Sequence, residues 1–297
     1  MESSIMSFPN RGKWGKSNWR GNASGHVYKE LFEQLKPRTF VDPMVGSGTS
    51  VEVAQEMGID AYGLDLHSGF NAIRHSIVEK VGKESDLIVS HPPYGSMIVY
   101  SGNVWGANAH PDDLSRCVDD NDFHEKMQLV LINQRMATKA GGYYGTLIGD
   151  WRRNGVYTSY QAEIIARMPR DELAGILIKT QHNCVSDSRQ YSQLALPRIM
   201  HEYLLLFRKK PKPILVLLGQ IAREQQTRLA GTWKAIVRAV LITIGGESEL
   251  QEVYRRVAEN APEKLATNLH WREKVRQVLN SNPCLFVSNQ RGLWALA

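Results

Sequence analysis

The first two thirds of this 297-residue chain predict an α/β fold with a mainly parallel sheet, and the last third predicts a smaller helical module. The α/β prediction rests on short apolar runs of strand length that alternate with amphipathic helical segments as far as residue 209, which is the pattern of strand–helix–strand units. The second module is predicted because a lysine- and proline-rich stretch, KKPKPI at 209–214, is followed by helical periodicity. We therefore expect a basic arm at 1–20, an α/β domain at 21–210 and a C-terminal module at 211–297.

The elements of the α/β domain follow from their periodicity and from the residues that stop them. Its strand-like runs are 39–42, 61–66, 86–90, 143–150, 173–181 and 201–209. A helix is predicted before the first of them, because the apolar residues of HVYKELFEQL recur at helical spacing and Pro37 ends the pattern. Further helices are predicted after a glycine-rich turn, ending at Gly58, and over 123–142. The short connection before the last strand predicts that this strand runs antiparallel.

The charge of the chain is unevenly distributed. The net charge is +6 and the isoelectric point is about 9.2; residues 1–20 hold four basic residues against one acidic, and residues 211–297 hold twelve against seven. Basic ends around a near-neutral middle are typical of an enzyme with nucleic-acid contacts attached. Ordinary solubilising charge is the alternative interpretation.

Cysteine usage and hydropathy predict a cytoplasmic protein with no membrane partner. Cys117, Cys184 and Cys284 are far apart, so they form neither a zinc-spaced pair nor a disulfide framework, and no metal site is predicted. The N-terminus is polar and lacks the apolar core of a signal peptide. The longest apolar runs, YLLLF and ILVLLG, are too short to span a bilayer.

The first chemical motif is VDPMVGSGTS at 41–50. Asp42 and Pro43 end a strand, and Gly46 and Gly48 allow a sharp turn that approaches a ligand without a Cβ in the way. The helix that follows begins with free N–H groups. Asp65 closes the next strand, where a carboxylate is well placed to accept both hydroxyls of a ribose; a solvated strand end is the alternative.

The second motif, SHPPYG at 90–95, ends the strand at 86–90. Pro92 and Pro93 hold the local carbonyl groups in a fixed direction and carry no competing donor. Such acceptors suit an amino group that must be oriented as a nucleophile. The neutral ring of His91 adds a side-chain acceptor, and Tyr94 offers a face on which a planar base stacks. A proline loop with a packing tyrosine is the alternative.

Together, these motifs resemble those of the amino-methylating DNA methyltransferases, which methylate adenine N6 or cytosine N4. DPMVGSGT is similar to their D-P-F-x-G-S-G-T signature and HPPY to their D/N/S-P-P-Y/F/W motif, in permuted order, and the resemblance covers about 20–208. It implies a Rossmann-like catalytic domain at 21–210 that uses S-adenosyl-L-methionine. The segment RGNASGHVYKELFEQLKP matches in position the family's contact with the methionine part. The resemblance implies these cofactor residues: Asn22, Ser24, Asp42, Pro43, Gly46, Ser47, Gly48, Thr49, Asp65, Phe70 and Asn71.

The resemblance also implies a mechanism, with His91, Pro92, Pro93 and Tyr94 as the catalytic residues. His91 and the Pro92 carbonyl would bind the two hydrogens of an exocyclic amine, so that its lone pair points at the donor methyl. The base would first be flipped from the duplex. Histidine replaces the family's usual Asp, Asn or Ser, and protonation would remove its acceptor nitrogen. We therefore expect activity to fall below about pH 6.5, the unperturbed histidine value.

The C-terminal module is predicted to be a winged helix that binds DNA, because three helical segments precede a hairpin of CLFVS and LWAL around the turn NQRG. A helical cap or a protein-docking module is the alternative. The third helix is expected to contact bases and phosphates. Arg291, at the tip of the wing, is expected to make a phosphate or minor-groove contact. Arg152 and Arg153, on a loop after a strand, are expected to contact phosphates. Tyr100 and Trp105, beyond the elbow, are expected to border the flipped base and partner strand. The DNA contacts expected are Tyr100, Trp105, Arg152, Arg153, Asn268, His270, Arg272, Lys274, Arg276 and Arg291.

The function predicted is transfer of a methyl group to adenine N6 of double-stranded DNA. Three alternatives stay open: cytosine N4 as the target, an RNA or protein-glutamine methyltransferase, and a DNA-binding regulator with an inactive methyltransferase body. A homodimer and a cognate restriction enzyme are further partners that the sequence leaves open.

Overall fold

The computed structural model describes residues 3–182 and 196–297, so the expectation for Cys184 lies outside the described residues. The chain divides into two compact units, Met1–Leu217 and Leu218–Ala297, with the boundary inside helix α6 (Ile214–Thr243). The sequence predicted this boundary at 210/211. Residues 211–217 belong to the first unit. One contact that holds this segment there comes from the buried Arg135, which donates to the carbonyl oxygens of Lys210 and Lys212, both at 3.2 Å.

A seven-stranded sheet forms the centre of the first unit, within its described residues, in the order β1-β8-β9-β5-β4-β2-β3. The strand pairs β2–β3, β2–β4, β4–β5 and β1–β8 are parallel, and β9 runs antiparallel to β5 and β8, as its short connection predicted. The strands are β1 (Ile5–Met6), β2 (Thr39–Asp42), β3 (Asp60–Gly63), β4 (Ser85–Ser90), β5 (Thr138–Ile148), β8 (Leu173–Thr180) and β9 (His201–Arg208). The sequence prediction of a Rossmann-like α/β fold is confirmed.

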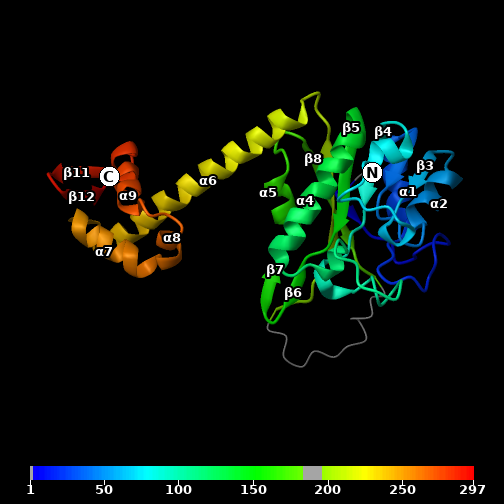
Figure 1. Cartoon of the computed structure of the whole chain (residues 1–297), viewed down its shortest axis with the longest axis horizontal. Helices are drawn as coiled ribbons and strands as arrows, with labels where there is room; N and C mark the ends of the chain where they lie inside the picture. Colours follow the sequence, from blue (N-terminus) through cyan, green and yellow to red (C-terminus); the bar gives the residue numbers. More distant parts are fainter. Residues whose placement is uncertain (1–2, 183–195) are drawn as a thin grey trace. The chain divides into compact units, whose positions relative to one another are not determined.

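Helices cover both faces of this sheet (Figure 1). Helices α1 (Gly25–Leu35) and α2 (Thr49–Glu56) pack on one face, against the side chains of Phe40, Leu87 and Leu147. Helices α4 (Asp120–Ala137) and α5 (Tyr160–Arg167) pack on the other, against Val41 and Ile88. Successive residues of one strand therefore enter different cores, because side chains alternate across a strand. The short helix α3 (Ile77–Val81) lies between β3 and β4 in the chain.

The N-terminal residues, expected to form an extended arm, are part of the first unit. Strand β1 adds to the sheet edge, where Ile5 pairs with Ile178 and Met6 with Lys179. Met6 is 1% exposed and Trp14 is 8% exposed, and the indole nitrogen of Trp14 donates to Glu56 at 2.8 Å. A two-residue strand has no periodicity of its own, so this pairing left no signal in the sequence.

Two local predictions were wrong. The helix expected over 123–142 ends at Ala137, and the next residue begins β5. Arg152 and Arg153, expected on a loop, lie in β6 (Trp151–Arg153), which pairs with β7 (Val156–Thr158) in a hairpin. The turn is Asn154–Gly155, with φ of 51° and 79°, and Asn-Gly is the preferred pair for a two-residue hairpin turn.

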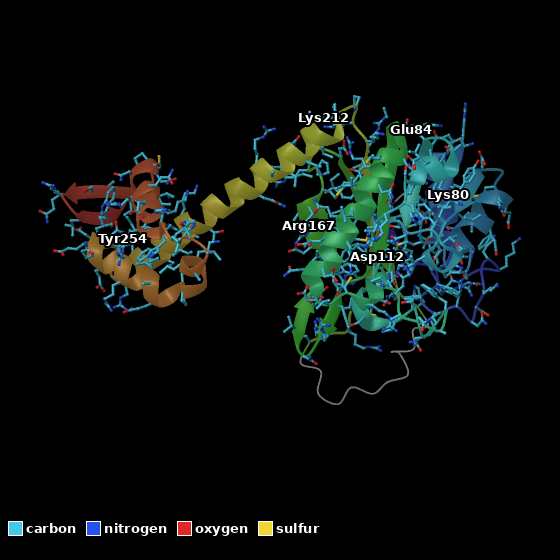
Figure 2. The ribbon with its side chains drawn as sticks, viewed as in Figure 1. Lys80, Glu84, Asp112, Arg167, Lys212 and Tyr254 are labelled. Carbon is cyan, nitrogen blue, oxygen red and sulfur yellow. The ribbon has the colours of Figure 1, made fainter. Side chains whose placement is uncertain are left out.

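The second unit begins at Leu218 and contains all but the first turn of α6. After α6 come β10 (Glu247–Glu249), α7 (Leu250–Asn260), α8 (Pro262–Ala266), α9 (Trp271–Ser281), β11 (Phe286–Gln290) and β12 (Leu293–Leu296). Its strands form an antiparallel sheet in the order β10-β12-β11. The core combines Val237, Val253, Val275 and Phe286, and Tyr254, labelled in Figure 2, meets the ring of Trp271 edge-on at 5.6 Å between centroids. The winged-helix assignment stays a prediction.

No helix among residues 3–182 and 196–297 combines the length and the apolar character needed to cross a membrane.

Candidate active site

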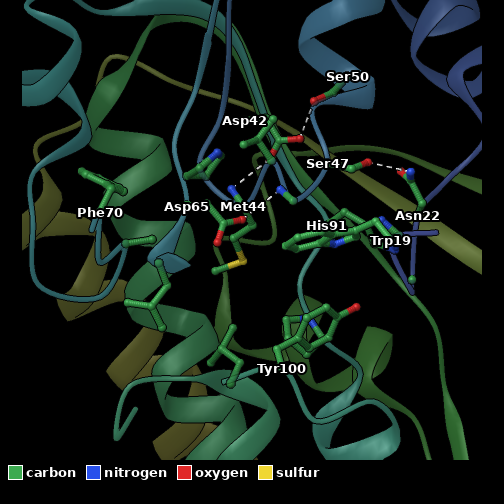
Figure 3. A pocket seen from close by; sticks show the side chains of 18 of the residues that line it. Trp19, Asn22, Asp42, Met44, Ser47, Ser50, Asp65, Phe70, His91 and Tyr100 are labelled. Atoms are coloured by element: carbon green, nitrogen blue, oxygen red, sulfur yellow. Dashed lines mark hydrogen bonds between the residues drawn. The ribbon is translucent and has the colours of Figure 1, made fainter. Parts of the chain in front are cut away.

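A cavity of about 850 Å³, which includes solvent at its mouth, lies where β2 and β4 end and the glycine-rich turn enters α2 (Figure 3). The sequence predicted half of its lining: Asn22, Asp42, Pro43, Gly46, Ser47, Thr49, Asp65, Phe70, Asn71, His91, Pro93, Tyr100 and Trp105. The other half was missed: Trp19, Gly21, Ala23, Tyr28, Met44, Val45, Ser50, Leu66, Ala72, Ile73, Asp112, Asp113 and Leu114. The glycine turn and the Pro-Pro-Tyr elbow therefore open into one cavity.

The Asp42 carboxylate is hydrogen-bonded to residues on both sides of the glycine turn. Its side chain is 2% exposed; one carboxylate oxygen accepts from the backbone N–H of Met44 at 2.9 Å, and the other accepts from the hydroxyl of Ser50 at 2.6 Å. Burial raises the pKa of Asp42 to about 7, against the lowering effect of these two hydrogen bonds. A cation bound beside Asp42 would stabilise the ionised form.

Asp65 connects the turn to the next strand. It follows β3 and caps the short 3-10 helix Leu66–Ser68. One oxygen accepts from the N–H of Gly46 at 2.9 Å, and the other accepts from the N–H of His67 at 3.0 Å and lies 2.7 Å from the His67 ring nitrogen Nδ1. The hydrogen bond to Asp65 raises the pKa of His67. The oxygen that accepts from Gly46 keeps a further lone pair, so Asp65 is held in place and remains able to accept from a ligand hydroxyl.

The segment before α1 closes over the glycine turn. The amide of Asn22 donates to the Ser47 hydroxyl at 2.7 Å, and its oxygen accepts from the Thr49 hydroxyl at 2.6 Å. The indole of Trp19 lies against Gly46. Ser24, predicted to contact the cofactor, lies outside the cavity lining, because its hydroxyl caps α1 by accepting from the N–H of His26 at 3.3 Å.

Gly46 is where an added methyl group should disturb the cavity most specifically. Its φ is +52°, and an added Cβ would lie 2.9 Å from Nε1 of Trp19. We expect Gly46→Ala to weaken ligand binding about tenfold, because the indole must move from its place over the turn; this corresponds to about 1.4 kcal/mol. Isothermal calorimetry with S-adenosyl-L-methionine, the donor expected from the sequence, measures the change.

Gly58→Ala is the matched control for Gly46→Ala. Gly58 also has positive φ, at +73°, but an added Cβ would meet nothing within 4 Å. Both variants therefore carry backbone strain, of about 1–2 kcal/mol for a left-handed non-glycine residue, and only Gly46→Ala crowds the cavity. Equal donor affinities for the two variants would contradict the position assigned to Gly46.

The Pro-Pro-Tyr elbow begins immediately after β4. His91 and Pro93 line the cavity, whereas Pro92 is buried and is not among the lining residues. The ring of Tyr94 packs against Gly149, where an added Cβ would lie only 2.6 Å from Cε2 of that ring. Its hydroxyl lies 2.8 Å from Nε2 of His91. Tyr94 is not among the lining residues of the cavity, so in this structure its ring does not present the stacking face expected from the sequence.

His91 does not titrate where the sequence predicted. Burial lowers the pKa of His91 to about 4, and the negative charge of Glu202 only partly opposes this effect. The ring is therefore neutral throughout the physiological range. Protonation of His91 therefore gives no reason for activity to fall at about pH 6.5, because that pKa belongs to a solvated imidazole.

The far side of the cavity is formed by the segment that follows the elbow. Asn71, predicted to border the cofactor, donates to the carboxylate of Asp112 at 2.8 Å, and Arg74 pairs with the same carboxylate. The hydroxyl of Tyr100 donates to the carbonyl oxygen of Arg20 at 3.1 Å and so connects this segment to the N-terminal one. In the part of the chain that the structure describes, the sheet ends at β3. The side of the cavity beyond β3 is therefore formed by the segment that follows the elbow and not by a further strand.

The expected DNA contacts fall into separate places. Tyr100 and Trp105 line the cavity, whereas Arg152 packs over the ring of Tyr157 and Arg153 over that of Trp151 in the β6–β7 hairpin. The remaining residues belong to the second unit, where α9 carries Arg272, Lys274 and Arg276, and Arg291 lies in the β11–β12 turn. Asn268 and His270, expected on the third helix, precede α9, because the Asn268 side chain accepts from the N–H of His270 and forms a local turn.

Within residues 3–182 and 196–297, no group of three or more His, Cys, Asp or Glu side chains is arranged to hold a metal ion.

Comparison with known proteins gives only distant structural likeness. No family model and no curated protein matches the sequence. TrmN from Thermus thermophilus has 15% identity and a TM-score of 0.40 over 64% of this chain and 50% of its own. A putative DNA modification methylase, also from Thermus thermophilus and complexed with S-adenosyl-L-methionine, has 19% identity and a TM-score of 0.29 over 59% of this chain and 56% of its own.

A putative hemolysin from Streptococcus thermophilus has 11% identity and a TM-score of 0.36 over 73% of this chain and 78% of its own. The chain thus spans about half the length of the first two proteins. These likenesses concern the fold alone.

Proposed function

We propose that the chain is an S-adenosyl-L-methionine-dependent methyltransferase that methylates the N6 amine of a flipped adenine in duplex DNA. One observation carries the proposal: the glycine turn with Asp42 and Asp65, and the elbow with His91, open into the same cavity. A donor held by the first therefore lies within reach of an amine held by the second. The DNA substrate and the choice of adenine rest on the resemblance of DPMVGSGT and HPPY to the amino-methylating DNA methyltransferases.

The residues of the cavity fit the chemistry of this donor. Its sulfonium and ammonium groups are cationic and suit the buried carboxylate of Asp42, and its ribose hydroxyls suit Asp65. The adenine ring suits the apolar wall made by Leu66, Ile73 and Leu114. The donor supplies the methyl group, and the chain supplies the geometry.

His91 and the elbow are proposed to orient the acceptor amine. A neutral imidazole nitrogen and the carbonyl oxygen of Pro92 accept the two amine hydrogens, and the nitrogen lone pair then faces the donor site. Positioning of this kind accounts for as much as about 7–11 kcal/mol of a reaction barrier. Because the Tyr94 ring packs against Gly149, we assign stacking on the base to Tyr100 and Trp105, two of the aromatic residues that line the cavity.

The second unit is proposed to bind the duplex as a winged helix. Its order of helix, strand, helices and terminal hairpin supports this assignment, with α9 as the helix that enters the major groove. Arg272, Lys274 and Arg276 supply positive charge along α9. The cavity accepts a base only after the base leaves the duplex, at a cost of about a few kcal/mol.

The second candidate function is a DNA-binding regulator that binds the donor without transferring its methyl group. Its motivation is His91, which replaces the Asp, Asn or Ser usual in the resembling family and has its ring engaged by Tyr94. Cytosine N4, RNA and protein glutamine remain alternative targets of an active enzyme, since they offer the same amine chemistry.

Sequencing that detects modified bases tests the proposal directly. Genomic DNA from cells that express the full chain is compared with DNA from cells that carry the empty vector. We expect N6-methyladenine at a defined sequence in the first sample only. N4-methylcytosine would transfer the proposal to the other base, and absence of any modified base would refute the assignment to DNA.

Donor binding should depend on pH near neutrality. With its pKa near 7, Asp42 is largely protonated at pH 6 and ionised at pH 8, and only the ionised form attracts a cation. We therefore expect the affinity for S-adenosyl-L-methionine to rise from pH 6 to pH 8, by at most about tenfold per unit below the pKa. Calorimetry in two buffers of different ionisation enthalpy should detect proton release at pH 6.

The matched ligand for this experiment is S-adenosylhomocysteine, whose sulfur is uncharged. Its affinity should change less between pH 6 and pH 8, and Asp42→Asn should remove the pH dependence for both ligands. An affinity for S-adenosyl-L-methionine that stays constant between pH 6 and pH 8 would place the donor sulfur away from Asp42.

The role of α9 predicts a change in salt dependence. Each phosphate contact adds about 0.9 to the slope of log affinity against log salt concentration. We expect Arg276→Gln to weaken duplex binding and reduce this slope by about one, measured by fluorescence anisotropy. Arg255→Gln is the control, because Arg255 lies on α7 and is held by two carboxylates, those of Glu252 and Glu259, whereas Arg276 has one exposed pairing, with Glu273 at 3.4 Å. An equal loss in both variants would argue against α9 as the contact.

A further inference from the structure

The hairpin of β6 and β7 begins beside the Pro-Pro-Tyr elbow. β5 ends at Ile148 and β6 starts at Trp151. An added Cβ on Gly95, the residue after the elbow, would lie 3.5 Å from Cζ3 of Trp151. The hairpin therefore starts at the carboxyl ends of β4 and β5, where the cavity opens, and Figure 1 shows it projecting at that end of the first unit.

Asp150 fixes the base of this hairpin. Its side chain is 5% exposed and accepts from the hydroxyl of Tyr157 at 2.9 Å, from the hydroxyl of Ser159 at 3.1 Å and from the N–H of Gln161 at 3.3 Å. A two-stranded hairpin is only marginally stable by itself. These contacts, together with the Asn154–Gly155 turn, therefore hold the hairpin in a defined shape.

The tip of the hairpin presents an apolar side chain. Val156 is 66% exposed and pairs directly with Arg153, and residues directly opposite in an antiparallel pair share a face. Trp151 shares that face, because it precedes Arg153 by two residues in the same strand. A stiff, β-branched side chain is thus exposed at the far end of the hairpin face whose base adjoins the elbow.

Positive charge accompanies this apolar tip. The guanidinium groups of Arg152 and Arg153 lie over aromatic rings of the hairpin. Arg152 also donates to the carbonyl oxygen of Pro197 at 3.2 Å, and Arg153 lies 3.6 Å from the carboxylate of Asp120. Exposed ion pairs of this kind contribute little, so phosphate groups can take their place.

We propose that the β6–β7 hairpin is a wedge for duplex DNA, in which Val156 enters the base stack at the position that the flipped base leaves and Arg152 and Arg153 contact the neighbouring phosphates. The inference rests on the proposed function and adds the surface that meets the opened duplex. Proteins that open or kink a duplex insert apolar side chains between base steps. An apolar tip with arginines beside it matches both parts of this ligand, the apolar stack and the anionic backbone.

Val118 shows that exposure alone does not make such a contact. It is 93% exposed, but Asp119, Asp120 and Asp122 follow it, and its N–H donates to Asp122 at 3.0 Å. Negative charge repels the phosphate backbone. Val118 is therefore a matched control for Val156: the same residue type, in the same unit, exposed in acidic surroundings.

Fluorescence anisotropy with the full chain, in the absence of methyl donor, tests the wedge without any methyl transfer. Two short duplex probes share one mixed sequence, and in the second probe a single adenine is replaced by an abasic analogue. The abasic position supplies a gap in the stack. We expect the wild type to bind the gapped duplex about tenfold more tightly than the intact one, because part of the cost of unstacking a base is removed.

Two substitutions of Val156 separate the wedge from the stability of the hairpin. Val156→Ala removes most of the apolar side chain. Val156→Thr keeps the β-branched shape that a strand favours, but its hydroxyl finds no partner inside the stack. Both variants should reduce the preference for the gapped duplex to about twofold or less, since little apolar surface is then buried in the gap. Val118→Ala and Val118→Thr should keep the wild-type preference.

The inference requires a gap preference in the wild type that is lost in both Val156 variants and in neither Val118 variant; any other pattern would overturn it, as would failure to bind either probe. The proposed function fails separately. Absence of modified bases in the sequencing experiment refutes methylation of DNA whatever the gap preference is, whereas N6-methyladenine in a protein without gap preference refutes the wedge alone.

Discussion

Replacing His91 with alanine should reduce methyl transfer by about 10²–10³-fold, the usual effect of removing one polar group that is aimed at a reacting atom. His91 is the side-chain acceptor of the elbow, and without it only the Pro92 carbonyl is left to orient the amine. Single-turnover measurement of product with DNA and excess donor gives the rate of transfer. Donor affinity should not change, because Asp42, Asp65 and the glycine turn remain intact.

His91→Asn is the graded control for this experiment. Asparagine restores an oxygen acceptor on a shorter side chain, so its transfer rate should lie between those of the alanine variant and the wild type. A thermal melt of each variant separates loss of transfer from loss of folding. An alanine variant that transfers methyl groups at the wild-type rate would remove His91 from the mechanism.

The sequence predicted the parts of the site that depend on local chemistry. Asp42 and Asp65 were identified because each lies at the carboxyl end of a predicted strand, and parallel strands bring their carboxyl ends to one edge of a sheet. The glycine turn was identified because Gly46 needs positive φ, which non-glycine residues seldom adopt. Strand and helix positions followed from periodicity in the same way.

The parts that the sequence did not predict depend on contacts between distant segments. Asp112 enters the cavity wall through Asn71, 41 residues away, and Trp19 covers Gly46 from a segment without helical or strand periodicity. The position of the Tyr94 ring depends on Gly149. This pairing leaves no local pattern, because it forms only when the sheet brings the end of β4 beside the end of β5.

The pKa of His91 illustrates the same limit. A residue type fixes the solution value of a pKa, but burial fixes the shift. The motif HPPY placed His91 correctly at the end of β4, and it carried no information on how deeply the ring would be enclosed. The ordinary histidine pKa assumed from the sequence therefore does not apply to His91.

Asp65→Ala should raise the dissociation constant of the methyl donor by at least about 100-fold. The carboxylate is proposed to accept both ribose hydroxyls, one of them in place of the His67 ring, and each hydrogen bond to a charged group contributes about 1.5–3 kcal/mol. The variant also frees the N–H of Gly46, which Asp65 now binds at 2.9 Å. Calorimetry with S-adenosyl-L-methionine and with S-adenosylhomocysteine should show the same loss for both, since the ribose is common to the two.

Asp60→Ala is the control for the Asp65 experiment. Asp60 lies five residues upstream in β3, where its exposed carboxylate pairs with Lys83 outside the cavity. This variant should bind the donor with wild-type affinity. A loss of affinity that is specific to Asp65→Ala and equal for both ligands would place the ribose at Asp65. A loss confined to the cationic ligand would instead place the sulfonium at Asp65 and remove the ribose from this end of the cavity.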